Sequence, residues 1–115
     1  MLQERASEPN DTGSTLKLAI ADDHKLLADA VASILRSEGT FDGISCYDLD
    51  SLLKLLGQDN YDVVLLDLRM PGMTGLDSVG QVVKAARDGN VVLFTGQIDR
   101  HVLDKALALG VRGLI

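Results

Sequence analysis

Short apolar runs alternate along this chain with longer stretches in which apolar residues recur at helical spacing. Clear runs lie at residues 16–21, 63–66 and 91–94, and weaker ones lie around 43–47 and from 111 or 112 onward. The run at 63–66 has no polar alternation, which is typical of a strand buried on both faces of a parallel sheet. Alternating strands and helices predict an α/β domain with five strands and four helices.

Each predicted helix lies between two of these runs and has one apolar stripe. We expect the second helix to begin at Asp48 or Asp50 and to end at Gly57. Asp99 and Gly110 are the expected caps of the fourth helix. The expected apolar stripes comprise Leu26, Leu27, Ala30, Val31, Ile34 and Leu35 in the first helix, Leu52, Leu53, Leu55 and Leu56 in the second, Leu76, Val79, Val82, Val83 and Ala86 in the third, and Val102, Leu103, Ala106 and Leu107 in the fourth.

Three of the runs end in polar residues that can carry chemistry. Asp22 and Asp23 follow the first run, Asp67 follows the central run, and Thr95 follows the run at 91–94. Open parallel sheets bind ligands beyond the carboxyl ends of their strands. Carboxylates gathered there repel one another until a divalent cation relieves the repulsion, and carboxylate oxygens suit Mg²⁺. Beside Mg²⁺, an ionised Asp67 can act as a nucleophile toward phosphorus, with the Thr95 hydroxyl bonding a phosphoryl oxygen.

Each of these residues also has a structural interpretation. A single Asp or Thr after a strand is often a cap or turn residue, and Asp22 and Asp23 could both cap the first helix. The coincidence of suitable groups at three strand ends favours the site. A haloacid-dehalogenase-type phosphatase also uses a strand-end Asp, but it needs a second acid where this chain has Arg69. A dinucleotide site would need a glycine-rich turn after the first strand, which is missing.

Size and composition restrict the kind of protein further. A chain of 115 residues with 46% apolar and 24% charged residues indicates one globular domain, with residues 1–14 as a mobile leader and 15–115 as the domain. The net charge of −6 argues against nucleic-acid contact by this chain. No apolar stretch could span a bilayer, and the polar N-terminus is not a secretory signal, so we expect a cytoplasmic protein. Cys46 is interpreted as a small hydrophobe in or beside a strand.

The ordered motifs resemble the receiver domain of two-component response regulators. The matching stretches are residues 20–24, 65–75 and 93–96, within a helix pattern that covers 16–115. The resemblance is greatest to receivers of helix-turn-helix (LuxR/NarL-type) transcriptional regulators. It implies a flavodoxin-like open parallel sheet of five strands in the order 2-1-3-4-5, here with the last helix absent from the sequence.

The resemblance also implies a role for each site residue. Asp67 would accept a phosphoryl group from a sensor histidine kinase. Asp23 and Asp67 would bind Mg²⁺ directly, Asp22 mainly through water, and Arg69 through its backbone carbonyl. Thr95 would bond the phosphoryl oxygen and act as the switch. The chain would then be a phosphorelay protein that at most catalyses its own phosphorylation and dephosphorylation, and it would control transcription through a DNA-binding domain outside this sequence.

Two departures from the family pattern open other possibilities. The lysine usual after the fifth strand would follow Ile115, and Leu114 stands where the family often has Tyr or Phe. Each large apolar side chain that the missing helix leaves uncovered forfeits roughly 1.5–3 kcal/mol, so we expect a homodimer or another form of self-association to cover that face. The alternatives are an interaction or dimerisation module that does not switch, and a stand-alone phosphoryl shuttle. His24 is interpreted as a capping or edge residue rather than a phosphohistidine, and His101 as solvent-exposed.

Overall fold

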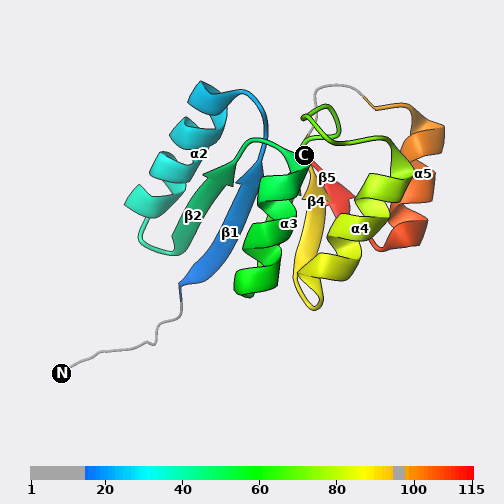
Figure 1. Cartoon of the computed structure of the whole chain (residues 1–115). Helices are drawn as coiled ribbons and strands as arrows, with labels where there is room; N and C mark the ends of the chain where they lie inside the picture. The colour runs from blue at the N-terminus through cyan, green and yellow to red at the C-terminus, as the bar shows by residue number, and fades with distance from the viewer. Residues whose placement is uncertain (1–14, 95–97) are drawn as a thin grey trace.

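The computed structural model describes residues 15–94 and 98–115 as a five-stranded parallel sheet with helices on both faces (Figure 1). The strand order is β2-β1-β3-β4-β5, which confirms the order implied by the resemblance. The elements are β1 (Leu16–Ala21), α2 (Lys25–Ser37), β2 (Phe41–Cys46), α3 (Leu49–Gln58), β3 (Val63–Leu66), α4 (Leu76–Ala86), β4 (Asn90–Leu93), α5 (Arg100–Leu109) and β5 (Gly113–Leu114). The expected leader at 1–14 and Thr95 lie outside the described residues.

Three of the predicted helix caps, Asp48, Asp99 and Gly110, are confirmed. The Asp48 carboxylate accepts a hydrogen bond from the Ser51 backbone N–H at the start of α3. Asp99 accepts one from the His101 N–H at the start of α5, and Gly110 ends that helix with a φ of 114°. His101 is exposed, as expected. Local hydrogen-bonding groups therefore fix these helix ends.

Three predicted boundaries shift by one or two residues. β2 begins at Phe41 rather than Gly43, because the parallel register pairs Phe41 with Leu16. α3 runs past Gly57, since the Asp59 N–H still donates to a carbonyl of the last turn. β5 begins only at Gly113, because the Val111 N–H closes the end of α5 by donating to the Ala106 carbonyl, at 3.1 Å.

The core has two layers, one on each face of the sheet. The larger lies beneath α3, α4 and α5 and includes Val64 and Leu66 of β3. The smaller lies beneath α2 and includes Ile20 and Leu65. Since Val64, Leu65 and Leu66 are all buried while neighbouring residues face opposite layers, β3 is covered on both faces, as predicted.

The apolar stripe predicted for α2 is right only in part: Val31 and Leu35 pack against the core as expected, but the fully buried positions are not among those predicted. The residues buried on this helix are Ala28 and Ala32, whereas Leu26 and Ile34 are 90% and 62% exposed. The close approach of α2 to β2 explains the difference: a Cβ atom on Gly43 would lie 3.2 Å from the Ala32 Cα. Small residues thus form the contact, and several larger apolar side chains of α2 remain at the surface.

Within the described ranges, none of the helices combines the length and the apolar character needed to cross a bilayer. Cys46, the last residue of β2, is 6% exposed, and burial raises the pKa of its thiol to about 12. A thiol held in this way packs as a small apolar group and forms little thiolate at neutral pH. This placement confirms the interpretation from the sequence.

Candidate functional site: acidic residues at the carboxyl ends of the strands

Strand register brings Asp22 and Asp67 to the same level of the sheet. Ala21 pairs with Leu66 in the parallel ladder between β1 and β3, so the next residue of each strand leaves the sheet beside the other. The Asp67 N–H donates to the Ala21 carbonyl at 2.9 Å, and the Asp22 N–H donates to the Cys46 carbonyl at 3.0 Å. Backbone hydrogen bonds therefore hold both acids in place before any side chain contributes.

Strand alternation sends both side chains to the same face. Ile20 and Leu65 point into the apolar layer beneath α2, and the residues two positions later follow them. Asp22 and Asp67 are buried, at 3% and 5% exposure. The Asp23 side chain is more open, at 38%. Asp22, Asp23 and Asp67 are called the acid cluster below, and the structure brings together these three predicted site residues.

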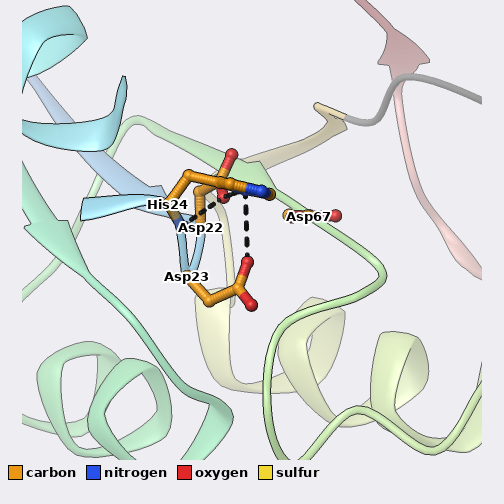
Figure 2. Close-up of side chains that lie close together, drawn as sticks. All are labelled: Asp22, Asp23, His24 and Asp67. Carbon is orange, nitrogen blue, oxygen red and sulfur yellow. Dashed lines mark hydrogen bonds and ion pairs between the residues drawn. The ribbon is translucent and has the colours of Figure 1, made fainter. Parts of the chain in front are cut away.

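His24 completes this group in a way that the sequence reasoning missed. It occupies the N-cap position of α2, in agreement with the interpretation as a capping or edge residue, but its side chain accepts no hydrogen bond from a backbone N–H of the helix. Its Nδ1 instead lies 2.8 Å from Asp22 Oδ1 and 3.3 Å from Asp23 Oδ1. Figure 2 shows the ring reaching over Asp22 toward Asp67. In the sequence, a histidine directly after two strand-end acids was the feature that could have predicted this contact.

The donor atoms fit a single divalent cation. One ligand atom each from Asp22, Asp23, His24 and Asp67 all lie within 4.8 Å of one another. Ligands on opposite sides of one ion are separated by about 4 Å for Mg²⁺ and about 5 Å for Ca²⁺, twice the metal–oxygen distance. Carboxylate oxygens are also the chemistry that hard cations prefer. The acid cluster is thus a candidate metal site.

The acid cluster gathers negative charges that a bound cation would neutralise. Burial raises the pKa of Asp67, and the nearby charges of Asp22 and Asp23 raise it further, while a hydrogen bond from the Arg69 N–H opposes the shift. The hydrogen bond to Asp22, and the charges of Asp22 and Asp23, raise the pKa of His24. In residues 15–94 and 98–115, no lysine or arginine forms an ion pair with the cluster. A bound cation would favour ionised Asp67.

The acid cluster opens into a hollow of about 430 Å³. One part of its wall is polar, formed by Asp22, His24, Asp67 and Arg69, and the other part is apolar. The apolar lining residues are Leu27, Phe94 and Ile115. Because the hollow is open to solvent beside a buried carboxylate, a small charged group can reach Asp67 from outside.

The loop after β3 is held rigidly against α3. Gly72 has a φ of +93°, and a Cβ there would lie 2.8 Å from the Leu49 Cβ, so only glycine fits this turn. The Leu49 N–H donates to the Pro71 carbonyl at 2.9 Å, and Met70 is 2% exposed. Arg69 lies in the same loop, and its N–H donates to Asp67 Oδ1 at 2.9 Å. These contacts fix the backbone beside Asp67.

Comparison with known proteins agrees with this architecture. The family model described as response regulator receiver domain matches residues 18–115. The glycerol metabolism activator of Pseudomonas putida is 39% identical over 103 residues, which cover 86% of this chain and 46% of that protein. The first four curated relatives are all matched over less than half of their own length.

Solved structures show the same fold. A DNA-binding response regulator of the LuxR family from Staphylococcus aureus matches with a TM-score of 0.73 and 29% identity, covering 87% of this chain and 84% of that one. A response regulator from Burkholderia pseudomallei, described with a phosphorylated aspartic acid and a calcium ion, matches with a TM-score of 0.78 and 20% identity, covering 86% of this chain and 58% of that one. The chain therefore belongs to the receiver domain family of two-component response regulators.

Proposed function

We propose that this receiver accepts a phosphoryl group on Asp67 from a sensor histidine kinase, with Mg²⁺ as its cation. The observation that carries the proposal is the placement of Asp67. It is the acid that ends the central strand, it is buried, and it faces an open hollow beside two further carboxylates. The phosphorylated aspartate of the Burkholderia pseudomallei regulator provides a precedent on the same fold.

In the proposed transfer, a carboxylate oxygen of Asp67 attacks the phosphorus of a phosphohistidine on the kinase. The new P–O bond forms as the P–N bond breaks, and the imidazole leaves with the bonding electron pair and takes a proton from water. When bound, the cation neutralises charge on the transferring oxygens. Asp67, Asp23 and the Arg69 carbonyl would hold the ion directly, and Asp22 through water. Fixed backbone hydrogen bonds keep the Asp67 carboxylate aimed into the hollow.

Signal output forms the second part of the proposal. Thr95 would bond the phosphoryl oxygen and report its presence, as the resemblance implies. The whole protein would control transcription through a DNA-binding domain, because the Staphylococcus aureus structure is a DNA-binding regulator. This chain would contact no nucleic acid itself, would act in the cytoplasm, and would be a signalling acceptor rather than an enzyme with its own substrate.

Phosphoryl acceptance is tested with a small phosphodonor. Incubation with acetyl phosphate and Mg²⁺ should add one phosphoryl group to the intact mass of the wild-type chain. Asp67→Asn should show no addition, whereas Asp62→Asn, which changes an acid at the opposite end of the sheet, should behave like wild type. Equal incorporation in all three proteins, or incorporation that survives in EDTA, would count against the proposal.

We also propose self-association through the apolar surface beside α2. Leu27, Ile34 and Ile115 are 46%, 62% and 70% exposed, and Leu27 and Ile115 line one hollow. Sedimentation across a dilution series should show dimers that dissociate in Leu27→Asp. Leu107→Asp, on α5 and 44% exposed in wild type, is the matched control and should remain dimeric. A monomer at every wild-type concentration would exclude this part of the proposal.

A further inference from the structure

The acid cluster contains one donor that carboxylate chemistry does not explain. His24 Nδ1 lies 2.8 Å from one carboxylate of the cluster and 3.3 Å from another. One ring nitrogen of His24 and one carboxylate oxygen each from Asp22, Asp23 and Asp67 also lie within 4.8 Å of one another. An imidazole nitrogen thus lies inside the space that the ligands of one cation would occupy.

The surroundings of His24 argue against a packing role for the ring. The side chain is 72% exposed, so it contributes little to the core. The nearby cation Lys25 lies against the Tyr47 ring, with its Nζ 5.2 Å from the ring centroid, and has no ion pair with the acids within the described part of the chain. Asp67 is buried, with 5% of its surface exposed, and it lines the same hollow as His24. His24 therefore has both the position and the freedom to serve a ligand there.

We propose that His24 is a ligand of the cation in this site and shifts its preference from Mg²⁺ toward borderline divalent ions such as Co²⁺, Ni²⁺ and Zn²⁺. The inference rests on the proposed cation site but goes beyond it. Mg²⁺ prefers oxygen ligands, whereas imidazole nitrogen favours the later transition metals. A site with three carboxylates and one imidazole discriminates between these ions, and a site with carboxylates alone does so less.

Co²⁺ is a suitable probe, because a histidine bound through Nδ1 carries its proton on Nε2. In the wild-type protein, Co²⁺ should produce a paramagnetically shifted, solvent-exchangeable N–H resonance. His24→Ala should lose that resonance and bind Co²⁺ at least about tenfold more weakly, with a smaller change for Mg²⁺. His101→Ala is the matched control, since the chain has two histidines and His101 lies exposed on α5. It should keep both the resonance and the affinity.

Two outcomes would overturn the inference. One is a wild-type Co²⁺ complex without the shifted N–H resonance, and the other is an equal loss of Co²⁺ and Mg²⁺ affinity in His24→Ala. Phosphoryl incorporation from acetyl phosphate with Mg²⁺, measured on the same variant, separates this result from the proposed function. If incorporation on Asp67 persists while the resonance is absent, the ligand role fails and the acceptor role stands.

Discussion

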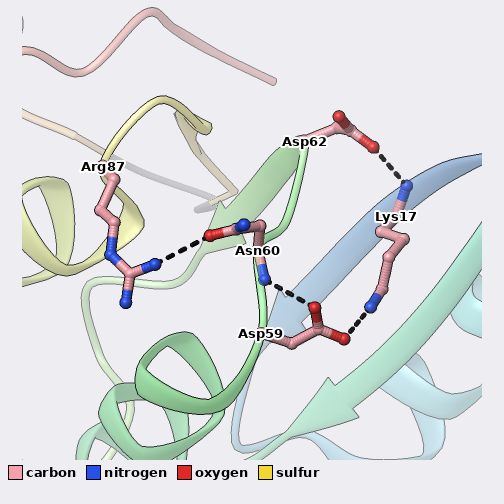
Figure 3. A network of polar contacts seen from close by, with 5 residues as sticks. All are labelled: Lys17, Asp59, Asn60, Asp62 and Arg87. Atoms are coloured by element: carbon pink, nitrogen blue, oxygen red, sulfur yellow. Dashed lines mark hydrogen bonds and ion pairs between the residues drawn. The ribbon is translucent and has the colours of Figure 1, made fainter.

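Acidic residues lie at both ends of the sheet, but their partners differ. At the amino ends, Lys17, Asp59, Asn60, Asp62 and Arg87 form a polar network, called the amino-end network (Figure 3). There the Lys17 ammonium pairs with Asp59, and the Lys17 backbone N–H donates to Asp62 at 2.7 Å. At the carboxyl ends, His24, which is charged only when its ring is protonated, is the only basic side chain paired with the acid cluster among the residues described.

The two ends also shift acid pKa values in opposite directions. Lys17 lowers the pKa of Asp59, because the charged carboxylate is stabilised by its partner. Burial raises the pKa of Asp67, because the charged form is poorly solvated. A carboxylate whose charged form is stabilised by a neighbouring ammonium contributes to the stability of the folded state. An acid left with a raised pKa in an open hollow is more typical of a functional site.

The largest expected effect is the stabilisation of the acid cluster by a cation. With Mg²⁺ at about 100 times its dissociation constant, the free energy of unfolding should rise by about 2.7 kcal/mol over its value in EDTA. Asp59→Asn should show the same increase, since it changes only the amino-end network. Asp67→Asn should show little or none. Urea denaturation with and without Mg²⁺ measures all three, and an equal gain in Asp67→Asn would remove the contrast between the two ends.

A smaller effect is expected from the amino-end network itself. Asp62→Ala removes the acceptor for the Lys17 backbone N–H, a contact that links the start of β1 to the residue before β3. The free energy of unfolding in EDTA should fall by about 1 kcal/mol. Asp62→Asn keeps an acceptor oxygen and should lose less. The dependence of stability on Mg²⁺ should be unchanged in both variants, and a changed response would show that the two ends are coupled.

The smallest effect is a difference in pH dependence, measured in EDTA. Because the pKa of Asp67 is raised in the folded state, its carboxyl group stays protonated to a higher pH in the folded state than in the unfolded state. Stability should therefore fall as pH rises from about 4, the unfolded value, through the folded pKa. Asp67→Asn should lack this loss. Asp59 has a lowered folded pKa, so its contribution should be present above about 4 and disappear at lower pH. Denaturation of wild type, Asp67→Asn and Asp59→Asn across this range checks both signs.

Much of the fold followed from periodicity and local chemistry. The strand at 63–66 and the caps Asp48, Asp99 and Gly110 were predictable, because continuous apolar runs, cap carboxylates and a glycine with positive φ act within a few residues. The buried positions of α2 could not be predicted, because helical spacing alone does not show that Ala28 and Ala32 approach β2 more closely than the larger residues do. That choice depends on a contact with Gly43, on another element.

The candidate site was predictable for a similar reason. Residues after neighbouring parallel strands must meet, so Asp22 and Asp67 could be paired from their places in the sequence alone. The position of the His24 side chain could not be predicted in this way, because it depends on the direction of the side chain at a turn. There Asp22 Oδ1 accepts a hydrogen bond from the His24 backbone N–H at 2.9 Å and lies 2.8 Å from His24 Nδ1. Backbone periodicity carries no information about that choice.

The most direct test of the account is to identify the residue that carries the phosphoryl group. The wild-type chain is incubated with acetyl phosphate and Mg²⁺, and borohydride then reduces any acyl phosphate to an alcohol, which converts an aspartyl phosphate into homoserine. Peptide mass spectrometry should place homoserine at position 67 alone. Homoserine at Asp22, Asp23 or Asp62, or none in a protein shown to be folded and to bind Mg²⁺, would contradict the assignment of Asp67 as the acceptor.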